Sequence, residues 1–262
     1  MTLQAPDSVR TRIREAERLR LFLDYDGTLA DFAPTPEHVD PKPEVISLLS
    51  KLAQHPRIRP MVISGRRLAH VRKLLPVREV LLAGTYGVEL LLPTGERVDR
   101  IAYEDVRPVL DTIKPRWERL LADGEGFFLE DKGWALAIHG RYVGEAEAEE
   151  VLEEARAEAE AVLADAPSGL FRLLGGHKFL EVGPTLAHKG KTVDYLLERY
   201  PWPGALPLYV GDDDKDEEAF SLIHAYGGLA IRVCEGSRNT AADGRLASPS
   251  DTRRWLRRLV GG

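Results

Sequence analysis

Short apolar runs of strand length alternate with segments of helical spacing at both ends of this 262-residue chain. Near the N-terminus the runs are "LRLFLDY", "IRPMVISGR" and "EVLLAGTYG", and the helical patterns between them are "PKPEVISLLSKLAQHP", with Pro43 near its start, and "RLAHVRKLLP". The same order returns at the C-terminal end in "KTVDYLLERY", "PLYVGDD", "DEEAFSLIHAY" and "LAIRVCE". Strands that alternate with helices predict βαβ units and a parallel sheet.

The middle of the chain follows a different pattern. Helices are predicted over 103–122 and 145–164, and the second of these carries an acidic face opposite its apolar one. Hairpins are predicted around Thr94-Gly95, in 127–142, and in "LFRLLGGHKFLEVGP" with Gly175-Gly176 at the turn. We therefore predict an α/β fold. Its doubly wound, mostly parallel core is built from residues 1–92 and 183–262, and an α+β module is inserted at 93–182.

Composition narrows the class of partner. A net charge of −6, from 36 Lys and Arg against 42 Asp and Glu, argues against a nucleic-acid or membrane-surface partner. The single cysteine, Cys234, cannot form an internal disulfide, and the N-terminal residues lack the apolar core of a secretory signal. No run approaches the length of a membrane span. We expect a cytoplasmic monomer or small homo-oligomer that acts on a small molecule.

Polar side chains follow or flank four predicted elements of the core. They are Asp24 and Asp26 in "DYDGT", Ser64 in "ISGR", Lys189 in "HKGK" and the acids of "GDDDKDE". Because ligands bind outside the carboxyl ends of the strands in an open parallel sheet, these groups are expected to converge. Several carboxylates can bind a hard cation such as Mg²⁺, and a hydroxyl with an ammonium can hold phosphate oxygens.

This set of groups suits phosphoryl transfer. Asp24 and Asp26 point the same way because side chains of an extended strand repeat with a period of two. One carboxylate can attack phosphorus to form an aspartyl-phosphate, and the other can handle the proton of the leaving oxygen. Taken alone, "DYDGT" can also be an Asp-Gly turn and Ser64 a helix N-cap. Lys191 competes with Lys189 for the same role, so only the joint pattern favours a phosphate site.

The same residues carry a resemblance to a known family. "DYDGT", Ser64 in "VISGR", Lys189 in "HKGKT" and "GDDDKDEEAF" resemble, in the expected order, the four motifs of the haloacid dehalogenase superfamily of phosphatases. The inserted block looks like a type IIB cap, and the core is expected to be Rossmann-like. Within the superfamily the chain is most similar to trehalose-6-phosphate phosphatases, through "LLAGTYGVEL", "KGWALAIHGR" and "HKFLEVGP" as well as the motifs.

The resemblance implies roles for five acids. Asp24 would be the nucleophile and a metal ligand. Asp26 would be the general acid and base, with its backbone carbonyl on the metal. Asp212 would be the third protein ligand. Asp213 and Asp216 would support the metal, either by direct coordination or by hydrogen bonds to the residues that coordinate it. The implied cofactor is Mg²⁺.

The resemblance also implies substrate contacts. Ser64 and Lys189 would hold the phosphate, with help from Thr28. Charged positions of the cap are implied to face the sugar, although each is also consistent with an exposed charge on a cap strand. The remaining implied substrate residues are Arg66, Glu89, Lys132, Arg141, Lys178 and Glu181.

Three positions depart from the family pattern. Tyr86 stands where the family commonly has His, Gly183 where it has Arg, and Lys215 where it has Thr. The expected reaction is hydrolysis of trehalose 6-phosphate to trehalose and phosphate. The alternatives are a phosphatase of mannosyl-3-phosphoglycerate, glucosylglycerol phosphate or sucrose phosphate, a phosphomannomutase-like phosphotransferase, and a non-catalytic sugar-phosphate sensor.

Overall fold

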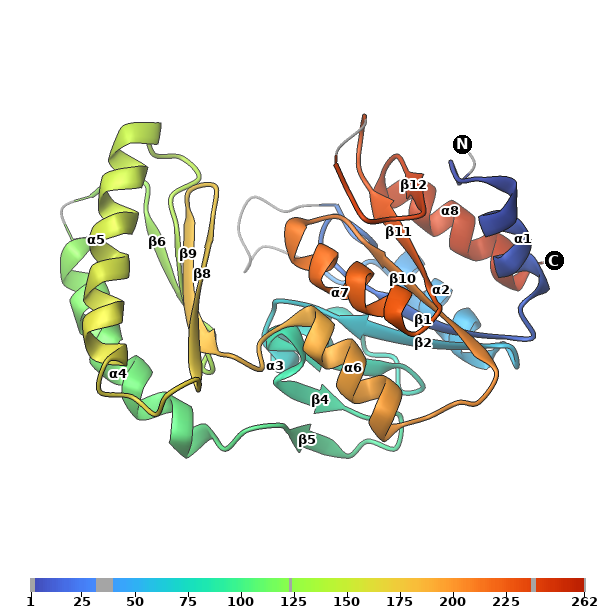
Figure 1. Ribbon diagram of the computed structural model, residues 1–262, viewed down its shortest axis with the longest axis horizontal. Coiled ribbons are helices and arrows are strands. Elements are labelled where there is room, and N and C mark those ends of the chain that lie inside the picture. The colour runs from blue at the N-terminus through green and yellow to red at the C-terminus, as the bar shows by residue number, and fades with distance from the viewer. Residues whose placement is uncertain (1–2, 32–39, 123, 237–238, 262) are drawn as a thin grey trace. The chain divides into compact units, whose positions relative to one another are not determined.

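The computed structural model describes residues 3–31, 40–122, 124–236 and 239–261. The chain divides into two compact units (Figure 1). One consists of Met1–Val98 with His188–Gly262, and the other of Asp99–Ala187. Within the described ranges, no helix has the length and apolar character needed to cross a bilayer.

The first unit is built on an eight-stranded sheet in the order β12-β11-β10-β1-β2-β3-β4-β5. Pairing is parallel from β12 through β3, and β4 runs antiparallel to β3. The predicted α/β fold with a mostly parallel sheet is therefore confirmed. The strands are β1 (Arg18–Leu23), β2 (Ile58–Ile63), β3 (Leu81–Gly84), β4 (Glu89–Leu91), β5 (Arg97–Asp99), β10 (Ala205–Gly211), β11 (Leu229–Val233) and β12 (Gly244–Leu246).

Helices cover both faces of this sheet, which explains why the second half of β1, "LFL" at 21–23, is apolar at every position and does not alternate with polar residues. Leu21 packs in a cluster with α1, α2, α3 and α8, whereas Phe22 packs in a second cluster with α6 and α7. Figure 1 shows α6 and α7 side by side over one face. The helices are α1 (Asp7–Glu15), α2 (Pro43–Gln54), α3 (Leu68–Leu74), the 3-10 turn η1 (Thr85–Gly87), α6 (Lys189–Arg199), α7 (Asp214–Ala225) and α8 (Pro249–Val260).

The strand order places a topological switch point between β1 and β10. From β1 the chain adds β2 and β3 on one side, and from β10 it adds β11 and β12 on the other. At such a point the loops that leave the carboxyl ends of the two strands diverge and open a crevice for a ligand. Asp24 directly follows β1 and Asp212 directly follows β10.

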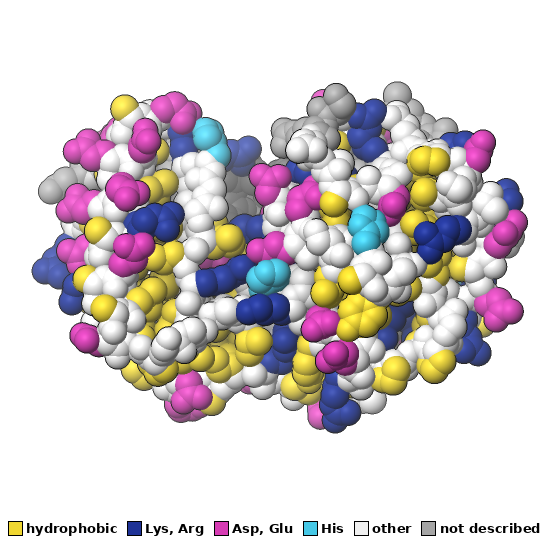
Figure 2. Space-filling model, viewed as in Figure 1, with side chains coloured by type: hydrophobic (Ala, Val, Ile, Leu, Met, Phe, Trp, Pro, Cys, Tyr) yellow, Lys and Arg dark blue, Asp and Glu magenta, His cyan; other side chains and the backbone are white. Residues whose placement is uncertain are grey.

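The second unit has a four-stranded antiparallel sheet, in the order β6-β7-β9-β8, and two long helices. The indole Nε1 of Trp117 donates to the carbonyl of Ala155 at 2.8 Å and ties the helices together. Figure 2 shows acidic side chains gathered over α5, as its sequence predicts. The elements are α4 (Tyr103–Leu120), β6 (Phe128–Asp131), β7 (Leu136–His139), α5 (Glu145–Leu163), β8 (Phe171–Gly176) and β9 (Phe179–Pro184).

One predicted turn in this unit is wrong. Gly175 and Gly176 do not form the turn of the last hairpin, because they pair with Leu180 and Phe179 and end β8. His177 and Lys178 make the turn, and Lys178 adopts φ 53°. Its ammonium donates to the carbonyl of Val143 at 2.7 Å and lies 2.8 Å from Glu145, contacts that hold this lysine in a backbone conformation usually left to glycine.

Candidate active site

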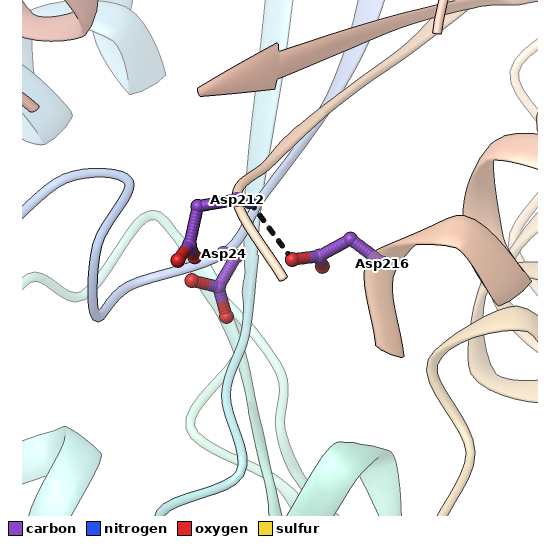
Figure 3. Close-up of side chains that lie close together, drawn as sticks. All are labelled: Asp24, Asp212 and Asp216. Atoms are coloured by element: carbon purple, nitrogen blue, oxygen red, sulfur yellow. Dashed lines mark hydrogen bonds between the residues drawn. The ribbon is translucent and has the colours of Figure 1, made fainter. Parts of the chain in front are cut away.

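Acidic side chains from the ends of two neighbouring strands meet at the carboxyl edge of the large sheet. Asp24 follows β1, Asp212 follows β10, and Asp216 lies in the first turn of α7. Their carboxylate oxygens can lie within 4.8 Å of one another. Figure 3 shows Asp24 and Asp212 close together, with Asp216 directed at the Asp212 backbone. The convergence that the sequence predicts for these three acids is present in the structure.

Asp216 is completely buried, and both of its oxygens already accept hydrogen bonds. Oδ1 accepts from the Lys189 ammonium at 2.6 Å and from the Tyr209 hydroxyl at 2.7 Å. Oδ2 accepts from the backbone N–H groups of Asp212 and Asp213 at 2.9 and 3.1 Å. Since four donors surround this carboxylate, its geometry favours a role in orienting the Asp212 loop. Asp24 and Asp212 are the remaining two acids of the cluster that could bind a ligand.

Lys189 is an ammonium enclosed by carboxylates. It begins α6, is only 2% exposed, and donates to Asp24 Oδ1 at 2.8 Å as well as to Asp216. Asp213 lies 3.5 Å from the same nitrogen. Burial alone would lower the pKa of Lys189, but Asp213, Asp216 and Asp24 together raise that pKa well above its usual value. Lys189 is therefore a permanent cation beside Asp24.

One ammonium does not balance the acids around it. Burial raises the pKa of Asp24 well above its usual range against the opposing effect of Lys189, and Asp212 and Asp213 add to the increase. Burial also raises the pKa of Asp212 to about 7, with Asp216 adding to it. Oxygen donors with excess negative charge in a buried pocket are the donor set that a hard divalent cation requires. The residues present therefore fit a metal ion such as Mg²⁺.

Asp213 has a structural task in addition to its proximity to Lys189. It is the N-cap of α7, and its Oδ1 accepts from the backbone N–H groups of Lys215 and Asp216, both at 3.0 Å. The Asp216 side chain reaches back to the Asp213 N–H, which completes a capping box. The motif "GDDDKDE" therefore forms a rigid helix start that fixes the position of Asp212.

Asp26 lies outside the cluster of three acids. Gly27, at φ 76°, turns the chain after "DYD", and the Asp26 carboxylate is held by Arg66. Nε of Arg66 donates to Oδ2 at 2.6 Å, and Nη2 donates to Oδ1 at 2.7 Å. This two-pronged pair sets the orientation of the carboxylate. The family resemblance implies Arg66 as a substrate contact, and in the structure Arg66 is the partner of Asp26.

Ser64 and Thr28 are buried at the edge of the site. Ser64 follows β2, and its Oγ accepts from the backbone N–H of Arg66 at 3.2 Å. The Thr28 hydroxyl donates to Asp212 Oδ1 at 3.3 Å. Thr28 is thereby tied to a candidate metal ligand, whereas Ser64 stabilises the turn that carries Arg66.

Glu89 anchors the loop beside the site. Its Oε2 accepts from the backbone N–H of Leu68 at 3.1 Å and from the Thr85 hydroxyl at 3.2 Å. Its Oε1 accepts from Arg97 at 3.2 Å. These partners join the start of α3 to η1, so the structure gives Glu89 a supporting position within the protein.

The loop at η1 brings two of the departures from the family pattern into contact. Thr85 and Tyr86 adopt φ 48° and 54°, and the Tyr86 ring packs against Gly65, where a Cβ would lie 2.7 Å from the ring. The Thr192 hydroxyl donates to the Tyr86 carbonyl at 2.7 Å. The Lys215 ammonium donates to the Tyr86 hydroxyl at 2.8 Å and lies 5.0 Å from the ring centroid. Sequence patterns alone gave no sign that these two residues touch.

The four predicted sugar contacts of the second unit fall into two groups. Lys132 and Glu181 are both buried and form an ion pair at 2.5 Å, with Glu130 3.8 Å from the same ammonium. Lys178 lies in the hairpin turn and Arg141 is exposed. The structure thus pairs Lys132 with Glu181, and it places the backbone of Lys178 beside the residue before Arg141, since the N–H of Gly140 donates to the Lys178 carbonyl at 2.9 Å.

Tyr209 is a site residue that sequence reasoning missed. It belongs to β10, is completely buried, and donates its hydroxyl to Asp216. Burial raises its pKa well above the usual value, with Asp216 adding to the increase. A tyrosine inside an apolar strand reads as core, so the sequence carries no signal for this contact.

Comparison with known proteins agrees with the site. A model of the trehalose-phosphatase family matches residues 22–250. The trehalose 6-phosphate phosphatase RA3 of Zea mays is 29% identical over 263 residues, which cover 94% of this chain and 71% of that protein. The solved Aspergillus fumigatus trehalose-6-phosphate phosphatase has a TM-score of 0.70 and 25% identity, covering 100% of this chain and 99% of that one.

The C-terminal domain of the C. albicans trehalose-6-phosphate phosphatase shares the fold, with a TM-score of 0.83 at 21% identity, and covers 100% of this chain and 99% of that chain. The family match extends from β1 to the start of α8 and includes every strand-end group described above. This protein therefore belongs to the trehalose-phosphatase family.

Proposed function

We propose that this chain is a Mg²⁺-dependent phosphatase that hydrolyses trehalose 6-phosphate through an aspartyl-phosphate on Asp24. The observation that carries the proposal is the buried Lys189, shared between Asp24 and Asp216 at the switch point of the sheet. The names of the relatives support the substrate, because those proteins are described as trehalose-phosphate phosphatases.

Asp24 is suited to attack phosphorus. Lys189 donates to Oδ1, so Oδ2 is the oxygen that can form the new bond to phosphorus while the bond from phosphorus to the sugar oxygen breaks. The same ammonium can then stabilise negative charge on the transferring group. In the second half of the reaction, a water oxygen attacks phosphorus and the bond to Asp24 breaks, which regenerates the carboxylate.

Asp26 is the candidate for both proton transfers. It would give a proton to the leaving sugar oxygen in the first step and take one from the attacking water in the second. Arg66 holds both of its oxygens, so the carboxyl stays in one orientation between the steps. A protonated carboxyl oxygen keeps a lone pair that can still accept from the guanidinium, so Asp26 can present its proton to the leaving group while Arg66 holds the carboxyl in place.

Mg²⁺ would be held by the carboxylates of Asp24 and Asp212 and by the backbone carbonyl of Asp26. When bound, the ion would draw charge from the phosphate oxygens and favour the ionised form of Asp24. Thr28 and Asp216 would keep Asp212 in position through the hydrogen bonds already described.

We further propose that the second unit, Asp99–Ala187, forms a sugar-reading cap. The buried pair Lys132 and Glu181 supports this part, because a buried ammonium in the turn between β6 and β7 and a buried carboxylate on β9 offer a rigid donor and acceptor to hydroxyl groups. Lys178 and Arg141 remain predicted sugar contacts.

The test is phosphate release from trehalose 6-phosphate beside mannosyl-3-phosphoglycerate, glucosylglycerol phosphate and sucrose phosphate, with Mg²⁺ and after chelation by EDTA. Asp24→Asn should lower kcat at least about a thousandfold. Asp214→Asn is the matched control, because this acid lies in the same motif but its side chain is 94% exposed. Turnover by Asp24→Asn or by the chelated protein would refute the mechanism. Preference for another ester, or isomerised sugar phosphate without free phosphate, would refute the substrate assignment.

A further inference from the structure

A buried arginine lies at the end of the sheet opposite the acid cluster. Arg20 is in the first half of β1, four residues before Asp24, and is only 2% exposed. Its Nη2 donates to the carbonyl of Leu196 in α6. Its Nε has no hydrogen-bond partner, and no carboxylate of the described chain pairs with this guanidinium. A buried charge without a counter-charge is costly, so the guanidinium of Arg20 favours a bound anion beside it.

The protein compensates only part of this charge. Leu196 is in the last turn of α6, whose C-terminus contributes roughly half a negative charge to its surroundings. Against this, Arg59 of β2 is the register partner of Arg20 on the neighbouring strand. Like charges placed opposite each other in a sheet repel. Burial, and then Arg59, lower the pKa of Arg20 to about 10.

Both arginines line one cavity of about 440 Å³. Arg59 is exposed, stacks 4.1 Å from the Trp202 ring centroid, and has no ion pair with any residue that the structure describes. The remaining wall is mainly apolar and includes Met61, Leu81 and Leu92. Glu79 is the single acid in the lining, so the charged side chains of the cavity sum to one positive charge.

We propose that this cavity binds a small carboxylate with an apolar body. The planar carboxylate would lie between Arg20 and Arg59, where it matches the geometry of a guanidinium. The apolar body would pack against Met61 and its apolar neighbours. A single negative charge neutralises the site, whereas a phosphate dianion would overcompensate it next to Glu79. The volume is within the range of small-molecule sites in proteins.

This site is separate from the phosphate site and independent of the proposed function. β1 carries Arg20 in its first half and Asp24 after its last residue, and α6 carries Leu196 near its end and Lys189 at its start. An occupant would contact the two elements that also position the nucleophile and its ammonium.

Hexanoate is the probe, and saturation-transfer NMR titration of the Mg²⁺-loaded protein is the measurement. Hexanol supplies the same apolar body without charge, and acetate supplies the charge without the body. We expect saturable binding of hexanoate, and binding of both controls at least tenfold weaker. Equal binding of hexanoate and hexanol, or no saturable binding of hexanoate, would overturn the proposal.

A matched pair of variants locates the site. Arg18 and Arg59 both stack on Trp202, at 5.8 and 4.1 Å, but only Arg59 lines the cavity. Arg59→Ala should weaken hexanoate binding about tenfold or more, and Arg18→Ala less than twofold. Arg59 is exposed, so its loss should not threaten folding, as loss of Arg20 could. Similar affinities in the two variants, or displacement of hexanoate by saturating inorganic phosphate, would place the probe elsewhere and refute the assignment.

Discussion

The role of Arg66 can be tested by replacing its guanidinium, which makes two hydrogen bonds to Asp26, with a group that keeps only the positive charge. Arg66→Lys leaves a cation but cannot donate to both oxygens of Asp26. The two hydrogen bonds measure 2.6 and 2.7 Å, and the Arg66 and Asp26 side chains are 11% and 24% exposed. A charge-assisted hydrogen bond contributes about 1.5–3 kcal/mol when shielded from water. This pair is partly solvated, and lysine keeps one contact with Asp26. We therefore expect Arg66→Lys to lose about 2 kcal/mol of interaction energy with Asp26.

If Arg66 orients Asp26 for proton transfer, the loss of this interaction raises the activation free energy by the same amount. At about 1.36 kcal/mol per tenfold, kcat on the sugar phosphate should fall about 30-fold with little change in KM. An aryl phosphate such as p-nitrophenyl phosphate should suffer less, since its leaving group needs no proton. Steady-state kinetics on both substrates measures the two effects.

The neighbouring exposed residue provides the control, because Arg67→Lys makes the same chemical change outside the pair. A rise in KM at constant kcat would show that Arg66 binds substrate, as the family resemblance implies, and would refute the positioning role. An equal loss of kcat on both esters would show that the effect does not depend on protonation of the leaving group, and it would contradict a role of Arg66 in that proton transfer.

Three further predictions concern stability. Tyr209→Phe should lower the free energy of unfolding by about 2 kcal/mol, because it removes a buried donor to Asp216, and urea denaturation measures this. Tyr86→Phe and Lys215→Thr should be non-additive in unfolding by about 0.5–1 kcal/mol in a double-mutant cycle, since the two side chains touch. Asp131→Asn should destabilise the protein by about 1 kcal/mol at pH 7, because Arg107 of α4 forms an ion pair with this partly exposed carboxylate. That arginine lowers the pKa of Asp131 well below its usual range, so the stabilisation is complete above about pH 4 and fades as the pH falls further.

Each stability prediction can fail in a definite way. Tyr195→Phe, a partly exposed tyrosine of α6, is the control for Tyr209 and should cost less. Additive effects at Tyr86 and Lys215 would show that their contact contributes no free energy. A deficit of Asp131→Asn that stays constant from pH 7 to pH 2 would contradict the ion-pair explanation.

The sequence predicts well those features that depend on short-range periodicity. The apolar second half of β1 follows from strand geometry, and the meeting of Asp24 with Asp212 follows from the shared edge of parallel strands. The hairpin turn was mispredicted because glycine is a strong turn signal locally, whereas pairing with Phe179 and Leu180 keeps both glycines in the strand.

Partners across elements could not be read from the chain. The bond from Tyr209 to Asp216, the fork of Arg66 on Asp26 and the exposed Arg59 beside Arg20 depend on distances between separate elements. Local patterns assign such residues to core, to substrate or to surface.

The contact between Tyr86 and Lys215 has an evolutionary consequence. The two positions are 129 residues apart in the chain, yet the ammonium and the phenol share a hydrogen bond. Replacing either one alone removes this hydrogen bond, so the two substitutions should be inherited together. Among relatives, lysine at the position of Lys215 should co-occur with a hydroxyl-bearing aromatic at that of Tyr86. The two departures from the family pattern would then mark a single branch of the family, one that could be recognised from two letters of sequence.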